Sequence, residues 1–321
     1  MIFEKKVVNL FESTLLRRHD PDSAVFYFSK DDFQGLECEE YSFLGDKGQR
    51  LAAYLYYKGE KRCDKLVIFE HGMGNGHASY MQEIHYLTEH GYTVFTYDHT
   101  GTRCSEGEHI GGFSQSLSDL DRALSFVHTI PEYADAEIVV IGHSWGGFST
   151  MNIAALHPEV KKVVAIAGFI SPKAIINQFL SGALSLYRKA VYKTEVDKFP
   201  DYCHFDGRVT LANTETRALI IHSRDDKTCL YKKHCAELEK ALRGRDNVEF
   251  LTLDGKDHNP NYTVDAVQYK SKFFKDLKAK TKAGELDTDE KRAEFVKSYD
   301  WERMTRQDEG VWNKIVEFME K

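Results

Sequence analysis

Short apolar runs recur along the chain, and polar stretches of helical length separate them. Six of these runs are almost continuously apolar, which is typical of strands buried on both faces of a parallel sheet. They are KLVIFE (65–70), YTVFTY (92–97), EIVVIG (137–142), KKVVAIAG (161–168), RALIIHS (217–223) and NVEFLTL (247–253). Two earlier runs predict an antiparallel hairpin, because YSFL (41–44) and the alternating RLAAYLYY (50–57) flank the turn sequence GDKGQ (45–49).

Strand and helix alternate through most of the chain. Apolar residues recur at helical spacing after four of the runs, as in SLSDLDRALSFVHTI, where Leu117, Leu120, Leu124 and Val127 share one face. The expected helices are 79–90, 116–130, 146–157 and 230–243. This alternation predicts an α/β fold with a doubly wound, mostly parallel sheet.

Two segments interrupt the alternation. Between KKVVAIAG and RALIIHS lie about forty residues more than a crossover needs, and we expect them to form a helical cap over the sheet. In the tail, VWNKIVEFM predicts a helix that packs on the sheet, and DTDEKRAEFVK has Asp287 and Glu290 at capping-box spacing. The predicted division is an N-terminal extension packed on the core (1–38), the core itself (39–169 and 216–321, ending in a helical extension, 261–321) and a cap insertion (170–215).

Composition narrows the class of protein. The 321 residues are 42% hydrophobic, enough for a large core, and the net charge is −7. An acidic chain argues against a nucleic-acid partner, because phosphate contacts require a basic face. One basic cluster is followed at once by acidic residues, so we interpret it as a solvated helix and linker. It consists of Lys270, Lys272, Lys275, Lys278, Lys280 and Lys282.

Location is inferred from the apolar runs and the cysteines. Charges interrupt the first residues, so no signal-peptide core is expected, and no run approaches ~18 apolar residues, so no integral membrane segment is expected. The six cysteines are scattered without a CxxC pair. In a chain of this length they indicate reduced thiols and a cytoplasmic protein.

A serine stands where a buried strand ends and a helix begins. In VVIGHSWGGF (139–148), Ser144 lies between glycines. Such a sharp turn strains the backbone of the serine, and Gly142 and Gly146 let strand and helix approach because they lack a Cβ. GHSWG alone also fits a surface turn. The strand before it and the helix after it favour a nucleophile elbow, which presents the serine hydroxyl above the carboxyl edge of the sheet.

The hydroxyl needs a base, and the base needs an acid. On this topology both come from loops after later strands, in the order serine, acid, histidine. His258 follows the strand NVEFLTL, whereas His234 is expected on the surface of a helix, so we assign the base to His258. The acid should follow RALIIHS, where spacing leaves Asp225 and Asp226 both open, and Asp257 ranks third.

Two main-chain N–H groups are the candidate oxyanion donors. One belongs to Trp145, at the start of the helix after the serine, and the other to Met73, in the glycine-rich loop HGMGNG (71–76). That loop lacks both the Lys-Ser/Thr pair of a phosphate-binding loop and the spacing of a dinucleotide fingerprint. A nucleotide site is therefore not expected there.

These stretches together resemble the α/β-hydrolase superfamily, specifically the branch of monoacylglycerol lipases and serine aminopeptidase-like (S33) hydrolases. The segment 69–107, from FEHGMGNG to CSEG, resembles that branch's oxyanion loop and D-x-x-G-x-G-x-S-x-G segment, and GHSWGG resembles its elbow. ALIIHSRDD resembles its acid strand, where the family's spacing selects Asp226 over Asp225. Cys104 and Ser223 depart from the small residues and the glycine that are common at their positions.

The resemblance implies a serine hydrolase without metal or organic cofactor. Its catalytic residues would be Ser144, Asp226 and His258, with Met73 and Trp145 at the oxyanion. It also implies that Asp98 and Gly101 are structural parts of the loop under the site.

We therefore expect cleavage of a carboxylic ester, small or lipid-like, through an acyl-enzyme, and we expect the apolar stretch 175–186 of the cap to line the substrate pocket. A serine aminopeptidase or thioesterase on the same triad is an alternative, and a non-catalytic binding protein on this fold is an alternative from another class. A metal enzyme is disfavoured, because His85 and His90 would diverge by about 140° on a helix.

Overall fold

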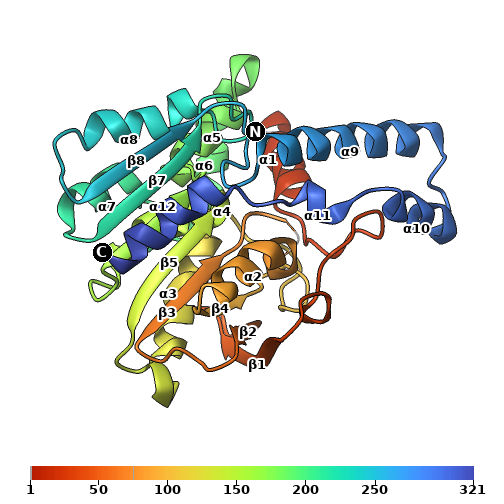
Figure 1. Cartoon of the computed structure of the whole chain (residues 1–321). Coiled ribbons are helices and arrows are strands. Elements are labelled where there is room, and N and C mark those ends of the chain that lie inside the picture. The colour runs from red at the N-terminus through yellow and green to blue at the C-terminus, as the bar shows by residue number, and fades with distance from the viewer. Residues whose placement is uncertain (1, 75) are drawn as a thin grey trace.

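The computed structural model describes residues 2–74 and 76–321, and within them eight strands form one twisted sheet (Figure 1). The strands are β1 (Leu36–Leu44), β2 (Arg50–Lys58), β3 (Lys65–Glu70), β4 (Thr93–Tyr97), β5 (Glu137–His143), β6 (Lys162–Ile166), β7 (Arg217–Ser223) and β8 (Val248–Leu253). Their order is β1-β2-β4-β3-β5-β6-β7-β8, with β2 antiparallel to both neighbours and all other pairs parallel. The predicted doubly wound, mostly parallel sheet is confirmed.

The six continuously apolar runs form strands within two residues of their predicted ends. The hairpin is also confirmed, but β1 begins five residues earlier than the apolar pattern indicates. The acidic residues before YSFL still pair, because β1 follows β2 along its whole length, from Leu36 opposite Lys58 to Leu44 opposite Arg50. Backbone pairing thus extends the strand beyond its apolar segment.

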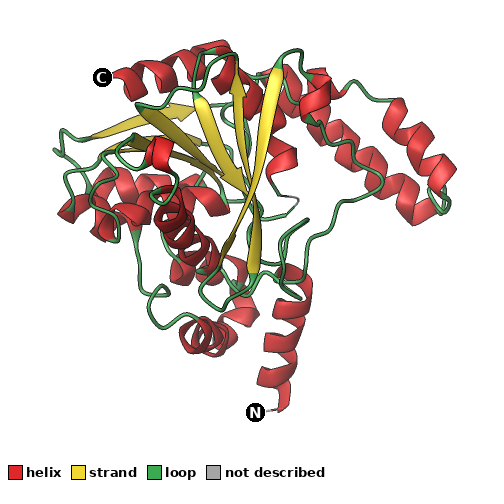
Figure 2. Cartoon of the chain, turned by 90° about the horizontal axis from the view of Figure 1, so that it is seen from below, coloured by secondary structure: helices red, strands yellow, loops and turns green. Residues whose placement is uncertain are grey.

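Helices cover both faces of the sheet (Figures 1 and 2). They are α1 (Ile2–Leu15), α2 (Met81–Glu89), α3 (Gln115–Val127), α4 (Trp145–Asn152), α5 (Pro172–Phe179), α6 (Arg188–Lys198), α7 (Gly207–Asn213), α8 (Cys235–Ala241), α9 (Val264–Ala283), α10 (Asp289–Lys297), α11 (Trp301–Met304) and α12 (Glu309–Glu320). Alternate residues of β3 point to opposite layers, which explains its unbroken apolar run. Leu66 and Ile68 pack with α3 and α4, and Val67 and Phe69 pack with α2 and α12.

The two helices predicted in the tail are present. In α12, Val311, Ile315 and Phe318 are buried against the sheet, as expected. Helix α10 does not use the predicted cap. Its N-cap is Thr288, whose hydroxyl accepts a hydrogen bond from the Lys291 N–H, because the helix starts one residue later than Asp287 would require.

Helices α9, α10 and α11 form a hairpin that projects from the body of the molecule (Figures 1 and 2). This C-terminal arm (264–304) has a small core of its own, made of Phe273, Leu286, Phe295 and Met304. Residues 170–215 fold into α5, α6 and α7 between β6 and β7. The division into extension, core and cap stays a prediction.

Two remaining expectations concern cysteines and membrane segments. All six cysteines are free thiols. Within the described residues, no helix combines the length and apolar character needed to cross a bilayer. The cytoplasmic location stays a prediction.

Candidate active site

Ser144 lies in the turn between β5 and α4, in a backbone conformation that side chains rarely adopt. Its φ is 57° and its ψ is −109°. Two hydrogen bonds hold this conformation: the Ser144 N–H donates to Ile166 O (2.8 Å), and Ser144 O accepts from the Phe148 N–H (3.1 Å). The predicted strand, tight turn and helix are therefore present in sequence around this serine.

The flanking glycines are required by close backbone contacts. A Cβ on Gly142 would lie 2.4 Å from Gly146 O, and a Cβ on Gly146 would lie 2.4 Å from Glu70 O. Both separations are far below van der Waals contact. The GxSxG spacing thus packs the turn against β3 and fixes the position of Ser144.

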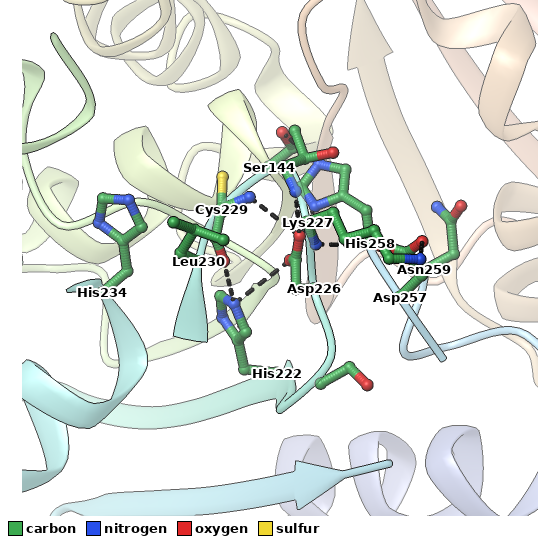
Figure 3. Close-up of polar contacts among 12 residues, drawn as sticks. Ser144, His222, Asp226, Lys227, Cys229, Leu230, His234, Asp257, His258 and Asn259 are labelled. Atoms are coloured by element: carbon green, nitrogen blue, oxygen red, sulfur yellow. Dashed lines mark hydrogen bonds and ion pairs between the residues drawn. The ribbon is translucent and has the colours of Figure 1, made fainter. Parts of the chain in front are cut away.

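The side chains of Ser144, His258 and Asp226 form one chain of hydrogen bonds (Figure 3). Ser144 Oγ lies 2.8 Å from His258 Nε2, and His258 Nδ1 lies 2.8 Å from Asp226 Oδ2. A carboxylate only accepts, so His258 carries its proton on Nδ1 and its Nε2 accepts the serine hydroxyl. The arrangement can remove a proton from Ser144 and stabilise the imidazolium that forms.

Asp226 is the carboxylate that reaches His258. Its Oδ1 accepts the N–H groups of Thr228 (2.7 Å) and Cys229 (2.9 Å), and its Oδ2 lies 3.3 Å from His222 Nε2. Burial alone would raise the pKa of Asp226, but the hydrogen bonds from His222 and His258 outweigh it and hold this pKa well below its usual range. Asp226 is therefore ionised at neutral pH.

The two other candidate acids bind elsewhere. Asp225 accepts hydrogen bonds from the Ser223 hydroxyl (2.6 Å) and from the Gly255 N–H (2.8 Å), so it ties the acid loop to the loop that carries His258. Asp257 pairs with Lys227 at 3.1 Å. Spacing in the sequence left Asp225 and Asp226 open, and the geometry places only Asp226 against the imidazole.

The candidate oxyanion donors lie at a helix start and in the loop after β3. Trp145 is the first residue of α4, so its N–H has no acceptor within the helix. The peptide just before Met73 is fixed on both sides: His71 Nδ1 donates to Gly72 O (2.7 Å), and the Gly72 N–H donates to the Tyr80 hydroxyl (3.0 Å). Asn75, in the same predicted loop, lies outside the described residues.

A hydrogen-bonded relay links three loops of the site, and sequence reasoning missed it. The Tyr80 hydroxyl lies 2.8 Å from His143 Nδ1, and His143 Nε2 lies 2.7 Å from the main-chain O of His258. A carbonyl only accepts, so His143 donates through Nε2 and accepts the Tyr80 hydroxyl at Nδ1. Burial and the neighbouring His258 lower the pKa of His143 to about 3, which keeps it neutral. Its position directly before Ser144 was the available signal.

A buried ionic cluster lies beneath the elbow. His99 Nε2 is 3.3 Å from Glu70 Oε2, and His99 Nδ1 is 3.2 Å from Asp119 Oδ2. Burial opposes the charged form of His99, but the two carboxylates outweigh it and raise its pKa to about 9. The His99 ring also packs on Trp145, with 4.8 Å between ring centroids, so the charge lies directly under the elbow helix.

Asp98 and Gly101 occupy the loop after β4. Asp98 Oδ1 accepts hydrogen bonds from the His77 N–H (3.0 Å) and from His77 Nδ1 (2.8 Å). Gly101 has a φ of 72°, and a Cβ there would lie 2.4 Å from His109 O. These contacts support the structural role that the resemblance implies for both residues.

The expectation that His234 is a surface residue is wrong. His234 is fully buried and lies apart from the triad (Figure 3), with Nε2 3.1 Å from Gln178 Oε1. Helix α8 starts only after His234, so its ring turns inward beneath α5 instead of pointing to solvent. Burial lowers the pKa of His234 to about 3.

The two histidines considered as metal ligands, His85 and His90, do not point toward a common site. His85 stacks on Phe33 and His90 stacks on Tyr86, with ring centroids 4.3 Å apart in each pair. Across residues 2–74 and 76–321, no group of three or more His, Cys, Asp or Glu side chains has the geometry to hold a metal ion.

Two cavities adjoin the candidate catalytic groups. The smaller, about 180 Å³, is lined by Gly72 and Met73, and the larger, about 420 Å³, is lined by His143 and His258. Their other described walls come from residues 25–28, 78–80, 227–228, 257–262 and 305 and from the C-terminal arm, and none comes from 170–215. Most of the apolar cap stretch packs elsewhere, since Ile175 and Ile176 are buried in the main core and Leu186 is exposed.

Comparison with known proteins shows which sequences part of the chain is similar to. Residues 61–218 match the family described as serine aminopeptidase, S33, a range that contains Met73, Ser144 and Trp145 but ends before Asp226 and His258. The chain is 31% identical to monoglyceride lipase of Mus musculus over 125 residues, which are 38% of this chain. The matched part spans only 39% of that lipase.

Solved structures share the fold at low sequence identity. An esterase of Pyrococcus furiosus superposes with a TM-score of 0.60 at 20% identity, covering 81% of this chain and 98% of that chain. An acetyl xylan esterase from Paenibacillus sp. R4 superposes with a TM-score of 0.56 at 18% identity, covering 80% and 88% of the two chains.

Proposed function

We propose that this chain, which has the α/β-hydrolase fold and resembles the monoacylglycerol lipase and S33 branch, is a serine hydrolase that cleaves carboxylic esters. The comparisons confirm that fold and that resemblance. The observation that carries the proposed chemistry is the unbroken hydrogen-bonded chain from Ser144 Oγ through His258 to Asp226.

The reaction proceeds through an acyl-enzyme. Ser144 Oγ attacks the ester carbonyl carbon while His258 Nε2 takes the hydroxyl proton, and Asp226 stabilises the resulting imidazolium. The N–H groups of Met73 and Trp145 bind the oxyanion. His258 then returns the proton to the leaving alcohol, and a water deprotonated by His258 releases the acid and regenerates Ser144.

The smaller cavity supports an apolar group on the substrate. It opens beside Met73, and aromatic side chains form much of its wall: Phe26, Tyr27, Phe28, Tyr80, Tyr262, Phe274 and Trp301. Its volume of about 180 Å³ lies below the ~300–1,000 Å³ of sites for drug-sized ligands. A small acyl or aryl group therefore fits this cavity better than a long chain.

A chain-length series of p-nitrophenyl esters, from acetate to decanoate, tests this function. We expect turnover by the wild type and a loss of at least ~10³-fold in Ser144→Ala, because the alcohol nucleophile is removed. Ser125→Ala, which changes an exposed serine of α3, is the matched control and should keep full activity. A wild-type rate no higher than uncatalysed hydrolysis would instead support the non-catalytic binding protein, and equal catalysed rates for both proteins would exclude Ser144 as the nucleophile.

A further inference from the structure

Lys270 lies where the two cavities beside the candidate catalytic groups meet. It lines the smaller cavity together with Met73 and lines the larger cavity together with His258. The wall common to both is formed by Ser79, Tyr80, Tyr262, Lys270 and Phe274. A group bound to Lys270 would thus be adjacent to both the oxyanion loop and the base.

The surroundings of Lys270 are mostly uncharged. Among the described residues that line the smaller cavity, it is the one charged side chain, and most of the others are aromatic or apolar. In the larger cavity the second lysine, Lys227, is already paired with Asp257 at 3.1 Å. An ammonium in such a site is costly unless a counter-charge accompanies it.

Lys270 forms no ion pair within the described chain. Its Nζ donates one hydrogen bond, to Asn259 Oδ1 (3.1 Å), and lies 5.0 Å from the centroid of the Tyr262 ring. Two other lysines of this region do have carboxylate partners, since Lys256 pairs with Asp308 at 2.6 Å and Lys272 pairs with Asp276 at 2.9 Å.

Glu83, on the neighbouring helix α2, interacts electrostatically with Lys270 but forms no hydrogen bond or ion pair with it. Its Oε1 accepts a hydrogen bond from Asn261 Nδ2 (3.1 Å). Burial raises the pKa of Glu83 to about 7, so its charge is incomplete at neutral pH. The sequence-based expectation that the lysine cluster is solvated holds only in part for Lys270, which is half-buried and lines both cavities, whereas Lys278 is exposed.

We propose that the substrate is an anionic ester, whose carboxylate pairs with Lys270 Nζ while its ester carbonyl lies between Ser144 and the Met73 N–H. This inference rests on the proposed esterase function. The anion supplies the counter-charge that Lys270 lacks, and the aromatic wall takes the apolar body of the molecule. The carboxylate belongs either to the acyl part or to the alcohol part of the ester.

Two matched substrate pairs distinguish these placements. For the acyl side, mono-p-nitrophenyl adipate is compared with p-nitrophenyl methyl adipate. For the alcohol side, 4-acetoxybenzoate is compared with methyl 4-acetoxybenzoate. Within each pair the two esters differ by one negative charge, and the measured quantity is the ratio of kcat/KM for the anionic ester to that for the neutral ester.

In the wild type we expect this ratio to exceed ten in at least one pair, and that pair places the carboxylate. Lys270→Met should lower the ratio at least tenfold, because the charge is lost while the side-chain length is kept. Lys270→Arg should retain most of it. Lys278→Met, two helical turns further along α9 and outside both cavities, should leave it unchanged.

The outcomes separate the two proposals. A wild-type ratio near one in both pairs, or a preference that survives Lys270→Met, overturns the anionic substrate while ester hydrolysis itself stands. Absence of hydrolysis of all four esters by wild type overturns the esterase proposal. Labelling of Lys270→Met by a fluorophosphonate at the wild-type rate confirms that the variant retains a folded site.

Discussion

Tyr80→Phe tests whether the relay positions the catalytic groups. The substitution removes only the hydroxyl, which accepts from the Gly72 N–H at 3.0 Å and donates to His143 Nδ1 at 2.8 Å. Both partners lose their hydrogen bond in a buried site, and each such group costs ~1–3 kcal/mol. We therefore expect the free energy of unfolding to fall by roughly 2–6 kcal/mol.

The same change should slow catalysis, because the Gly72 peptide carries the chain into Met73. A misplaced oxyanion donor lowers kcat by up to ~10²-fold. We expect a 10- to 100-fold fall in kcat on p-nitrophenyl acetate with a smaller change in KM, and urea unfolding gives the stability. Tyr86→Phe, in the helix α2 that begins directly after Tyr80, is the control, since no described residue hydrogen-bonds the Tyr86 hydroxyl. A Tyr80→Phe protein with stability within 1 kcal/mol and kcat within twofold of wild type would refute the relay.

Two further predictions concern charged groups. Asp226→Asn should lower kcat by about 10³- to 10⁴-fold, because an amide cannot hold His258 in the required tautomer, whereas Asp225→Asn should cost less than tenfold; similar losses in both variants would contradict the assignment. The pKa of His99 is raised to about 9 in the folded protein, against 6.5 in the unfolded chain. The protonated ring therefore stabilises the folded state fully below pH 6.5, and this stabilisation is lost as the pH rises through 9. In urea unfolding, the free energy of unfolding should therefore fall by up to roughly 3 kcal/mol between pH 6 and 9, and this fall should be smaller in His99→Gln. A pH dependence of the free energy of unfolding that this substitution leaves unchanged would exclude His99 as its source.

Local pattern and chain order were sufficient to predict much of this molecule. Continuous apolar runs identify buried parallel strands, because each strand must be apolar on both faces. The elbow around Ser144 is readable from three residues, since only glycines fit the contacts on either side. His258 follows from topology, because the loops after successive parallel strands meet at one edge of the sheet.

Tertiary contacts decide what the sequence leaves open. Asp225 and Asp226 are equivalent in spacing, and only the fold of the acid loop turns Asp226 toward the imidazole. His234 and Lys270 were expected in solvent because their neighbours in sequence are charged. Helix α5 instead covers His234, and Lys270 lines two cavities.

Apart from the position of His143 directly before Ser144, the sequence gives no sign of the relay, because its members are far apart along the chain. Tyr80 and His143 are separated by 63 residues, and His143 and His258 by 115. No periodicity or motif links such positions. The prediction that the cap stretch lines the substrate pocket also depends on distant contacts, since an apolar helical stretch does not reveal which surface it covers.

Covalent labelling shows whether Ser144 is the nucleophile. The 321-residue chain is treated with a biotinylated fluorophosphonate and digested, and the modified peptide is sequenced by mass spectrometry. We expect one phosphonyl group per chain, attached to Ser144, and its loss in Ser144→Ala. Attachment to any other residue, or undiminished labelling of Ser144→Ala, would contradict this assignment.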